Sequence, residues 1–349
     1  MTLHAPDTRP EEIVPLNHPQ SGLRGFIVVH STALGQGAGG CRLWTYDDDE
    51  AALADALRLA EGMTFKNALA GLPFGGAKAV IRRPAGDFDR QAMFRAFGEA
   101  VEALEGRYVT AEDVGTNIKD MHDIASQTAY VAGLAKQDGR AGGDPSPWTA
   151  LGVFEAMKAA ADHALGAKIA GLRVAVQGVG NVGEGLCALL ADAGAHLVVA
   201  DIDPRRTDRM REAHRAEVVG IDAIAEADAD IFAPCALGGV LTPDSVSRIT
   251  ARVICGGANN QLSGPGVADM LVARNISYVP DYVANAGGII NVSAEYLNEE
   301  ADQVRARVLA IGPRTGHILK QASAQKVSPA TVADAAARRI VETARAVNA

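Results

Sequence analysis

The chain has few cysteines and no concentration of positive charge, and each absence excludes certain kinds of protein. Its cysteines are scattered without CxxC spacing, so neither a disulfide framework nor a metal site is predicted; they are Cys41, Cys187, Cys235 and Cys255. We therefore expect free thiols in the reducing cytoplasm. The net charge of −9 at pH 7 argues against a nucleic-acid backbone or an anionic membrane as the main partner. Small molecules are the expected partners.

Long apolar segments are missing as well. No apolar run is long enough to span a bilayer, and the start MTLHAPDTRPEE lacks the basic and apolar segments of a signal peptide. The sequence has the composition of a globular protein, with 48% hydrophobic and 21% charged residues. Because 349 residues exceed the size at which one core keeps growing, two domains are expected.

Two lysines, Lys66 and Lys78, stand in unusually apolar surroundings, in the segment GMTFKNALAGLPFGGAKAVI. Pro73 and the pair Gly75–Gly76 interrupt any helix there and allow the backbone to approach a bound group. Lysines beside apolar runs commonly keep the ammonium in water, so each lysine alone is compatible with a surface role. Asp113 is expected at the carboxyl end of a short strand, and this position favours a catalytic cleft over a surface role for the lysines.

The segment QGVGNVG predicts a dinucleotide-binding turn. A short apolar strand leads directly into a GxGxxG motif, a helix follows, and Asp201 ends the next strand. Gly178 would permit the tight turn, Gly180 the approach of a pyrophosphate, and Gly183 close packing of helix on strand. Asp201 would accept hydrogen bonds from the adenosine ribose and repel a 2′-phosphate, which favours NAD over NADP.

Alternating strands and helices predict an α/β protein with two domains. Residues 139–315 are assigned to a Rossmann-like domain with a doubly wound parallel sheet that binds the dinucleotide. Residues 1–138 form an α/β domain for substrate binding and catalysis, on which 316–349 are expected to pack back. The turn-rich segment DGRAGGDPSP connects the domains, and a cleft is expected between them. A long helix is expected from residue 298 onward.

Eight ordered motifs carry a family resemblance over nearly the whole chain. They read GGCRLW, GMTFKNALAGLPFGGAKAVI, YVTAEDVGT, GDPSPWTALGV, QGVGNVG, APCALGG, GGANNQL and PDYVANAGGIINV. Together they resemble the glutamate/leucine/phenylalanine/valine dehydrogenase family, and within it the leucine and phenylalanine branch. The resemblance implies NAD-dependent oxidative deamination of an apolar L-amino acid to its 2-oxo acid and ammonia, by a homo-oligomer that uses the first domain for assembly.

The resemblance also assigns catalytic and substrate-binding roles. Lys66 would bind the substrate carboxylate, Lys78 would activate water, and Asp113 would move protons to and from the amino group. A buried ammonium beside a second positive charge gives up its proton more easily, so we expect Lys78 to act as a neutral base near physiological pH. The backbone of Gly39 and Gly40 would lie beside the substrate carboxylate.

The remaining assignments concern the cofactor and the side-chain pocket. Thr149 would orient the nicotinamide carboxamide, and Asn259 would bond near the substrate amino group and the nicotinamide ribose, although a structural loop role for Asn259 stays open. Further cofactor contacts are expected from loop residues, namely Asn181, Val182, Cys235 and Ala236. The side-chain pocket is expected to be lined by Ala38, Met63, Ala111, Ile289 and Val292.

Ala38 argues against a glutamate-type substrate. Glutamate-specific relatives carry a lysine at this position, and burying a γ-carboxylate without a partner would be prohibitive. Leucine dehydrogenases usually have leucine there, so Ala38 enlarges the pocket toward a phenyl ring, whereas Ile289 takes space back. A branched-chain substrate such as leucine is favoured, and phenylalanine is the alternative within the same family.

Two other classes of function stay open. A catalytically silent NAD-binding regulator would share the fold, but the presence of Lys66, Lys78 and Asp113 argues against it. An NAD-dependent hydroxy-acid dehydrogenase would need a histidine–carboxylate pair. The candidates for that histidine are His122 and His163, and both are expected on helix surfaces.

Overall fold

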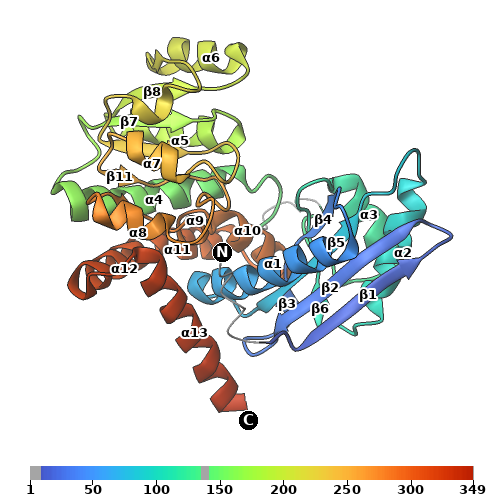
Figure 1. Cartoon of the computed structure of the whole chain (residues 1–349). Coiled ribbons are helices and arrows are strands. Elements are labelled where there is room, and N and C mark those ends of the chain that lie inside the picture. The colour runs from blue at the N-terminus through green and yellow to red at the C-terminus, as the bar shows by residue number, and fades with distance from the viewer. Residues whose placement is uncertain (1–8, 135–140, 349) are drawn as a thin grey trace. The chain divides into compact units, whose positions relative to one another are not determined.

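The computed structural model describes residues 9–134 and 141–348, and these divide into two compact units (Figure 1). Unit 1 comprises the described residues up to 143, residues 291–301 and those from 336 onward, and unit 2 comprises 144–290 and 302–335. The predicted boundary between 138 and 139 lies outside the described residues. Within the segment 316–349, residues up to 335 group with unit 2 because helix α12 (Ile311–Gln325) packs against α4 (Ser146–Leu165).

Unit 1 is built on a mixed sheet with strand order β1-β2-β5-β3-β6, in which β4 also pairs with β5. The strands are β1 (Glu12–His18), β2 (Leu23–Ser31), β3 (Gly37–Ala38), β4 (Cys41–Trp44), β5 (Gly75–Arg82) and β6 (Tyr108–Val109). β1, β2 and β5 are antiparallel neighbours, whereas β3, β4 and β6 contribute parallel pairings. The two-residue strand β3 has little β propensity of its own and forms because it lies between β5 and β6.

Helices cover both faces of this sheet (Figure 1). Val28 and Val80 contact α1 (Asp49–Ala70), in a cluster with the alanines Ala52, Ala56 and Ala60. The neighbouring residues of β2 and β5 belong to a second cluster, which includes Phe94 and Phe97 of α2 (Arg90–Glu102) and Ile124 of α3 (Ile118–Ala125). Because side chains alternate along a strand, Lys78 lies on the same face of β5 as Val80, the face toward α1.

Helix α1 is longer than the sequence pattern predicts, and this places Lys66 on it. The pattern predicts a helix over 51–63, whereas α1 continues to Ala70 and ends at Gly71, which adopts the left-handed conformation with φ 69°. At its start Asp48 caps the helix by accepting a hydrogen bond from the amide of Ala51 at 2.7 Å. Lys66 therefore lies about one turn before the end of α1.

Unit 2 contains a parallel sheet with strand order β12-β11-β10-β7-β8-β9. Its strands are β7 (Arg173–Gln177), β8 (His196–Ala200), β9 (Glu217–Val218), β10 (Ile231–Pro234), β11 (Val253–Ile254) and β12 (Ser277–Tyr278). Helix α4 packs with α5 (Asn181–Asp192), and α7 (Pro243–Arg248) packs with α8 (Val267–Ala273). The doubly wound parallel sheet predicted for this part of the chain is confirmed.

The remaining helices are α6 (Pro204–His214), α9 (Asp281–Ala284), α10 (Gly287–Tyr296), α11 (Ala301–Leu309) and α13 (Pro329–Asn348). The long helix predicted from residue 298 is wrong, because the described chain forms α11, α12 and α13 in succession. Lys326 closes α12 in a left-handed conformation with φ 57°, and Pro329 begins α13 at a position where its missing N–H costs nothing. None of the helices described combines the length and the apolar character needed to cross a bilayer.

Candidate active site

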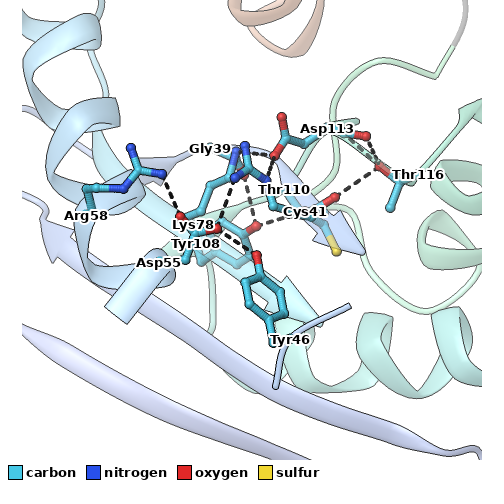
Figure 2. Close-up of polar contacts among 11 residues, drawn as sticks. Gly39, Cys41, Tyr46, Asp55, Arg58, Lys78, Tyr108, Thr110, Asp113 and Thr116 are labelled. Carbon is cyan, nitrogen blue, oxygen red and sulfur yellow. Dashed lines mark hydrogen bonds and ion pairs between the residues drawn. The ribbon is translucent and has the colours of Figure 1, made fainter. Parts of the chain in front are cut away.

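Lys78 and Asp113, which the sequence singles out separately, form an ion pair within unit 1. Lys78 lies in the middle of β5 and is only 5% exposed. Its Nζ lies 2.8 Å from Oδ2 of Asp113, which follows β6 (Figure 2). The sequence predicts a positive charge near Lys78, yet the charge in contact with its ammonium is this carboxylate. The pair supplies both a proton donor and a proton acceptor in a largely buried place.

The loop that carries Asp113 is tied to β4 through Thr116 (Figure 2). The Thr116 hydroxyl accepts a hydrogen bond from the Asp113 amide at 2.9 Å and donates to the carbonyl of Cys41 at 3.0 Å. The amide of Cys41 in turn donates to the carbonyl of Ala111 at 2.8 Å. These bonds fix the backbone position from which the Asp113 side chain extends to Lys78.

The charges around Asp113 keep it ionised. Burial alone would raise the pKa of this carboxyl, but the positive charges of Lys78 and Arg42 outweigh burial, and the pKa lies below its usual value. A hydrogen bond from the amide of Val114 acts in the same direction. Asp113 is therefore a carboxylate at neutral pH and is able to accept a proton.

Arg42 is a site residue to which the sequence motifs give no role. Its Nε lies 3.1 Å from Oδ2 of Asp113, and its Nη1 lies 3.0 Å from Oδ2 of Asp55 on α1. The motif GGCRLW contains the only local signal, which is a charged residue between two buried apolar ones, Cys41 and Leu43. A positive charge on a strand between buried neighbours requires partners, and these come from far along the chain.

Gly39 and Gly40 bring bare backbone close to the Lys78–Asp113 pair. A Cβ atom added to Gly40 would lie 2.8 Å from Cβ of Asp113, and one added to Gly39 would lie 1.9 Å from the Ala77 carbonyl oxygen. Neither position has room for a side chain. The carbonyl of Gly39 accepts a hydrogen bond from the Tyr108 hydroxyl at 2.9 Å (Figure 2).

Other predicted substrate residues lie around the same backbone. A Cβ on Gly39 would lie 3.0 Å from Cγ of Met63, which places this α1 side chain beside the glycine pair. Asn67, the neighbour of Lys66, donates to the carbonyls of Gly75 at 2.6 Å and Ala38 at 3.3 Å. The end of α1 is thereby tied to β3 and β5. Three further pocket candidates are distributed over both units: Ala111 and Val292 are half-buried in unit 1, and Ile289 is half-buried in unit 2.

The three motif glycines in unit 2 adopt the geometry of a tight strand-to-helix turn. Gly178 has φ 88°, and a Cβ on Gly183 would lie 2.0 Å from the Gly178 carbonyl oxygen. Gly180 is the N-cap residue of α5, and a Cβ added to it would contact only Nη1 of Arg206, at 3.7 Å. Two of the glycines are thus needed for packing, and the third leaves space over the helix N-terminus.

Asp201 is engaged by the protein itself. Its Oδ2 accepts the amide of Val179 in the glycine turn at 2.8 Å, and its Oδ1 accepts the amide of Asp203 at 2.9 Å. Its side chain is only 4% exposed, with Nη1 of Arg206 at 3.7 Å. Asp201 therefore holds the glycine turn in place, a role that the sequence motif does not reveal. Its bond to a ribose stays a prediction.

The remaining cofactor candidates of unit 2 lie on loops and in the first turns of α4 and α5. A Cβ added to Gly178 would lie 2.7 Å from the Cβ of Ala236, so Ala236 lies next to this glycine. Cys235 Sγ accepts a hydrogen bond from the amide of Gly257 at 3.4 Å. Val182 and Asn181 begin α5. Thr149 donates to the carbonyl of Pro145 at 3.0 Å, and the Oδ1 of exposed Asn259 accepts a hydrogen bond from Nδ2 of Asn285 at 2.8 Å. Asn285 is a partner that the sequence motifs leave without a role.

Comparisons with known proteins agree over both units. Residues 10–130 match the dimerisation domain of Glu/Leu/Phe/Val dehydrogenases, and 144–205 and 199–348 match the glutamate/leucine/phenylalanine/valine dehydrogenases. A leucine dehydrogenase of Bacillus subtilis is 44% identical over 336 residues, covering 96% of this chain and 92% of the relative. A valine dehydrogenase of Streptomyces virginiae is 42% identical, covering 96% and 94%. The crystal structure of L-tryptophan dehydrogenase from Nostoc punctiforme has a TM-score of 0.86 at 36% identity, covering 96% of this chain and 97% of that one. The chain therefore belongs to the glutamate/leucine/phenylalanine/valine dehydrogenase family and is an amino-acid dehydrogenase.

Proposed function

We propose that this chain catalyses the NAD-dependent oxidative deamination of a branched-chain L-amino acid, with leucine favoured, to the 2-oxo acid and ammonia. The observation that carries the proposal is the buried Lys78–Asp113 pair beside Gly39 and Gly40. The leucine and valine dehydrogenases at 44% and 42% identity support an aliphatic substrate. Phenylalanine is the alternative substrate, because Ala38 leaves more room than a leucine would.

The glycine turn of unit 2 fits a dinucleotide. The open space over Gly180 lies at the N-terminus of α5, where free amides and the helix dipole favour a phosphate. Gly178, Gly180 and Gly183 would hold the pyrophosphate, and Asp201 would face the adenosine ribose. When bound, NAD supplies the acceptor for the hydride of the substrate α-carbon. Arg206, whose Nη1 is 3.7 Å from Asp201, would contribute to the choice between NAD and NADP.

Lys66 and the glycine pair would bind the carboxylate of the substrate. An ammonium on α1 offers a charge-assisted hydrogen bond to a carboxylate, and the backbone of Gly39 and Gly40 would lie beside that carboxylate. Binding the acid end at a fixed point orients the α-carbon, and this orientation contributes much of the rate that an active site supplies.

Lys78 and Asp113 would manage the protons. Asp113, as a carboxylate, takes a proton from the substrate amino group, which must be neutral before the α-carbon loses hydride. Lys78 then removes a proton from the water that adds to the iminium carbon, and the carbinolamine collapses to the oxo acid and ammonia. Asp113 returns the proton it took to the amino nitrogen of the carbinolamine, which then leaves as ammonia, and the 2.8 Å contact between Asp113 and Lys78 gives a direct path for a proton between the two groups.

The proposal is tested by following NADH formation at 340 nm with leucine, valine and phenylalanine, using NAD and NADP in parallel. We expect turnover with NAD and the largest kcat/KM for an aliphatic substrate. NAD binding without turnover of any of the three would favour the silent regulator. A hydroxy acid as the better substrate would favour the hydroxy-acid dehydrogenase. That class needs a histidine–carboxylate pair, whereas His163 Nε2 lies 2.9 Å from the Ser323 hydroxyl.

Substitution of Ala38 by leucine is expected to shift the preference from aromatic toward aliphatic substrates. Ala38 is only 6% exposed, so a leucine side chain at this position would extend into the interior and would narrow a pocket that Ala38 lines. One or two methylenes in an apolar pocket change kcat/KM by about 10- to 200-fold. The measurement is the ratio of kcat/KM for leucine to that for phenylalanine in the variant and the native chain. An unchanged ratio would show that Ala38 does not line the pocket.

A homo-oligomer in the cytoplasm is proposed on family grounds. The match of residues 10–130 to a dimerisation domain supports assembly through unit 1.

The described cysteines are free thiols, and burial raises the pKa of Cys235 to about 11, so this thiol stays protonated at neutral pH.

A further inference from the structure

We propose that Arg42 is a positioning residue, which bridges Asp113 and Asp55 and so holds the carboxylate of Asp113 beside Lys78. The inference rests on the proposed function, because it gives Asp113 its role in proton transfer. It adds a residue outside the reacting groups, on a strand that the catalytic assignments leave unused. Three observations carry it, namely the geometry of Arg42, the anchoring of Asp55 and the sharing of one carboxylate oxygen.

The first observation is that Arg42 makes its two contacts through different nitrogens. Nε lies 3.1 Å from Oδ2 of Asp113, and Nη1 lies 3.0 Å from Oδ2 of Asp55. The guanidinium is planar and rigid, so two contacts at two edges fix its orientation as well as its place. The side chain is 17% exposed, which limits competition from water. Lysine would offer one point charge and no such bridge.

The second observation is that Asp55 is itself held on both oxygens. Its Oδ2 also accepts the Tyr46 hydroxyl at 2.6 Å, and its Oδ1 accepts Nη2 of Arg58 at 2.6 Å (Figure 2). Burial would raise the pKa of Asp55, but these partners and Arg42 keep it below the usual value. Asp55 is thus a fixed negative anchor on α1, and Arg42 is held between two carboxylates.

The third observation is that Lys78 and Arg42 contact the same oxygen of Asp113, Oδ2. Without Arg42, Oδ2 would keep one cation instead of two, and rotation of the carboxylate would cost less. Charges alternate from Lys78 through Asp113, Arg42 and Asp55 to Arg58. The removal of one member changes the charge felt by all the others.

Other titratable groups near Asp113 do not replace Arg42. Burial raises the pKa of the Cys41 thiol on β4 and of the Tyr108 hydroxyl on β6, so both are neutral in the working range. Asp120 is paired with Arg90 at 2.7 Å. Burial also raises the pKa of Glu112, on the same loop as Asp113. Among these groups Lys78 and Arg42 supply the positive charge that lowers the pKa of Asp113.

The test measures kcat, KM and the pH profile of kcat/KM for leucine oxidation in the full chain with Arg42→Gln, Arg42→Lys and Asp55→Asn. Arg42→Gln should lower kcat by about 10- to 100-fold through loss of alignment, with KM for NAD unchanged. It should also move the acidic limb of the pH profile upward, since a lost positive charge raises the pKa of Asp113. Because Lys78 and Asp113 are in contact, the limb reports the pair as a unit.

The other variants separate charge from geometry. Arg42→Lys should leave the acidic limb near its native position and still lower kcat, because it keeps the charge and loses the bridge. Asp55→Asn should move the limb downward, opposite to Arg42→Gln, because it removes a negative charge. The matched control is Arg24→Gln, which removes one arginine of unit 1 whose side chain is 61% exposed and pairs with Asp49.

The outcomes distinguish this inference from the proposed function. Absence of turnover in the native chain would remove the proposed function and the inference together. If the native chain is active and Arg42→Gln has the same kcat and the same acidic limb of the pH profile as Arg24→Gln, the positioning role alone is overturned. If Arg42→Gln does not fold, as judged by thermal unfolding, Arg42→Lys decides the question. Native kcat in that variant would overturn the bridge, and a lowered kcat with an unmoved limb would support it.

Discussion

Replacing Lys78 with alanine is expected to lower kcat for leucine oxidation by about 10²- to 10⁴-fold, the range that a positioned acid–base group contributes. The reason is structural, because Lys78 is 5% exposed and its Nζ is fixed 2.8 Å from Asp113. The affinity for NAD should change little, since the dinucleotide turn belongs to unit 2 and Lys78 to unit 1. Steady-state kinetics give kcat, and fluorescence titration gives the Kd of NADH.

Lys119→Ala is the matched control for this variant. Lys119 is an exposed lysine on α3 of the same unit, so its loss removes an equal charge without touching Asp113. We expect native kcat and a native thermal transition in the control, and thermal unfolding of Lys78→Ala shows whether that variant is folded under the assay conditions. If Lys78→Ala retained more than about a few per cent of native kcat, Lys78 would not be the base and the assignment of the pair would be wrong.

The Lys78 variant should also change the pH behaviour of Asp113. Burial of Asp113 favours its protonated form, and Lys78 is the stronger of the two cations that oppose burial. With Lys78 absent, the pKa of Asp113 rises, because Arg42 then opposes burial without Lys78. Residual turnover in Lys78→Ala should therefore fall off at a higher pH on the acid side than turnover of the native chain. A pH profile of the residual kcat/KM checks this sign.

The glycine turn of unit 2 is the part of the molecule that the sequence predicts best. Its geometry depends on neighbours within a few positions, because the strand, the turn and the helix are consecutive. Gly178 requires a positive φ, and Gly183 lacks room for a Cβ, and both properties follow from local backbone geometry. Strand–turn–helix periodicity therefore suffices to locate them.

The surroundings of the Lys78–Asp113 pair are predicted only in part, for a physical reason. Arg42 and Asp113 are 71 positions apart, and their contact exists because β3 and β4 both pair with β5 and β6 pairs with β3. No local pattern encodes that register, and β3 is too short to be recognised from propensity. Arg42 therefore has no partner visible in the sequence, although a charge between buried Cys41 and Leu43 indicates that one exists.

Asp201 shows a different limit of the motif. Its position about 20 residues after the glycines predicts a ribose contact, but its two oxygens accept amides of Val179 and Asp203. A side chain that is 4% exposed stabilises the turn whether or not a ribose is bound. The motif therefore predicts the place of the carboxylate correctly, and its structural role becomes visible only in three dimensions.

Gly180→Ala and Gly183→Ala should both weaken NAD binding, but for different reasons. At Gly180 an added Cβ meets only Arg206 Nη1 at 3.7 Å and φ is −72°, so the variant should fold normally. The methyl group would then occupy the space through which a pyrophosphate approaches the amides of α5. Loss of one hydrogen bond to a charged group costs about 1.5–3 kcal/mol, which corresponds to roughly a 10- to 100-fold rise in Kd.

At Gly183 the added Cβ would lie 2.0 Å from the backbone oxygen of Gly178, so the turn or the start of α5 must move. This variant should lose both NAD affinity and thermal stability, whereas Gly180→Ala should lose affinity alone. Gly220→Ala is the control, because its Cβ would have no neighbour within 4 Å. Titration with NADH and thermal unfolding of all three variants give the comparison. Native NAD affinity in Gly180→Ala would place the pyrophosphate elsewhere, and equal unfolding temperatures in Gly183→Ala and Gly220→Ala would contradict the packing role of Gly183.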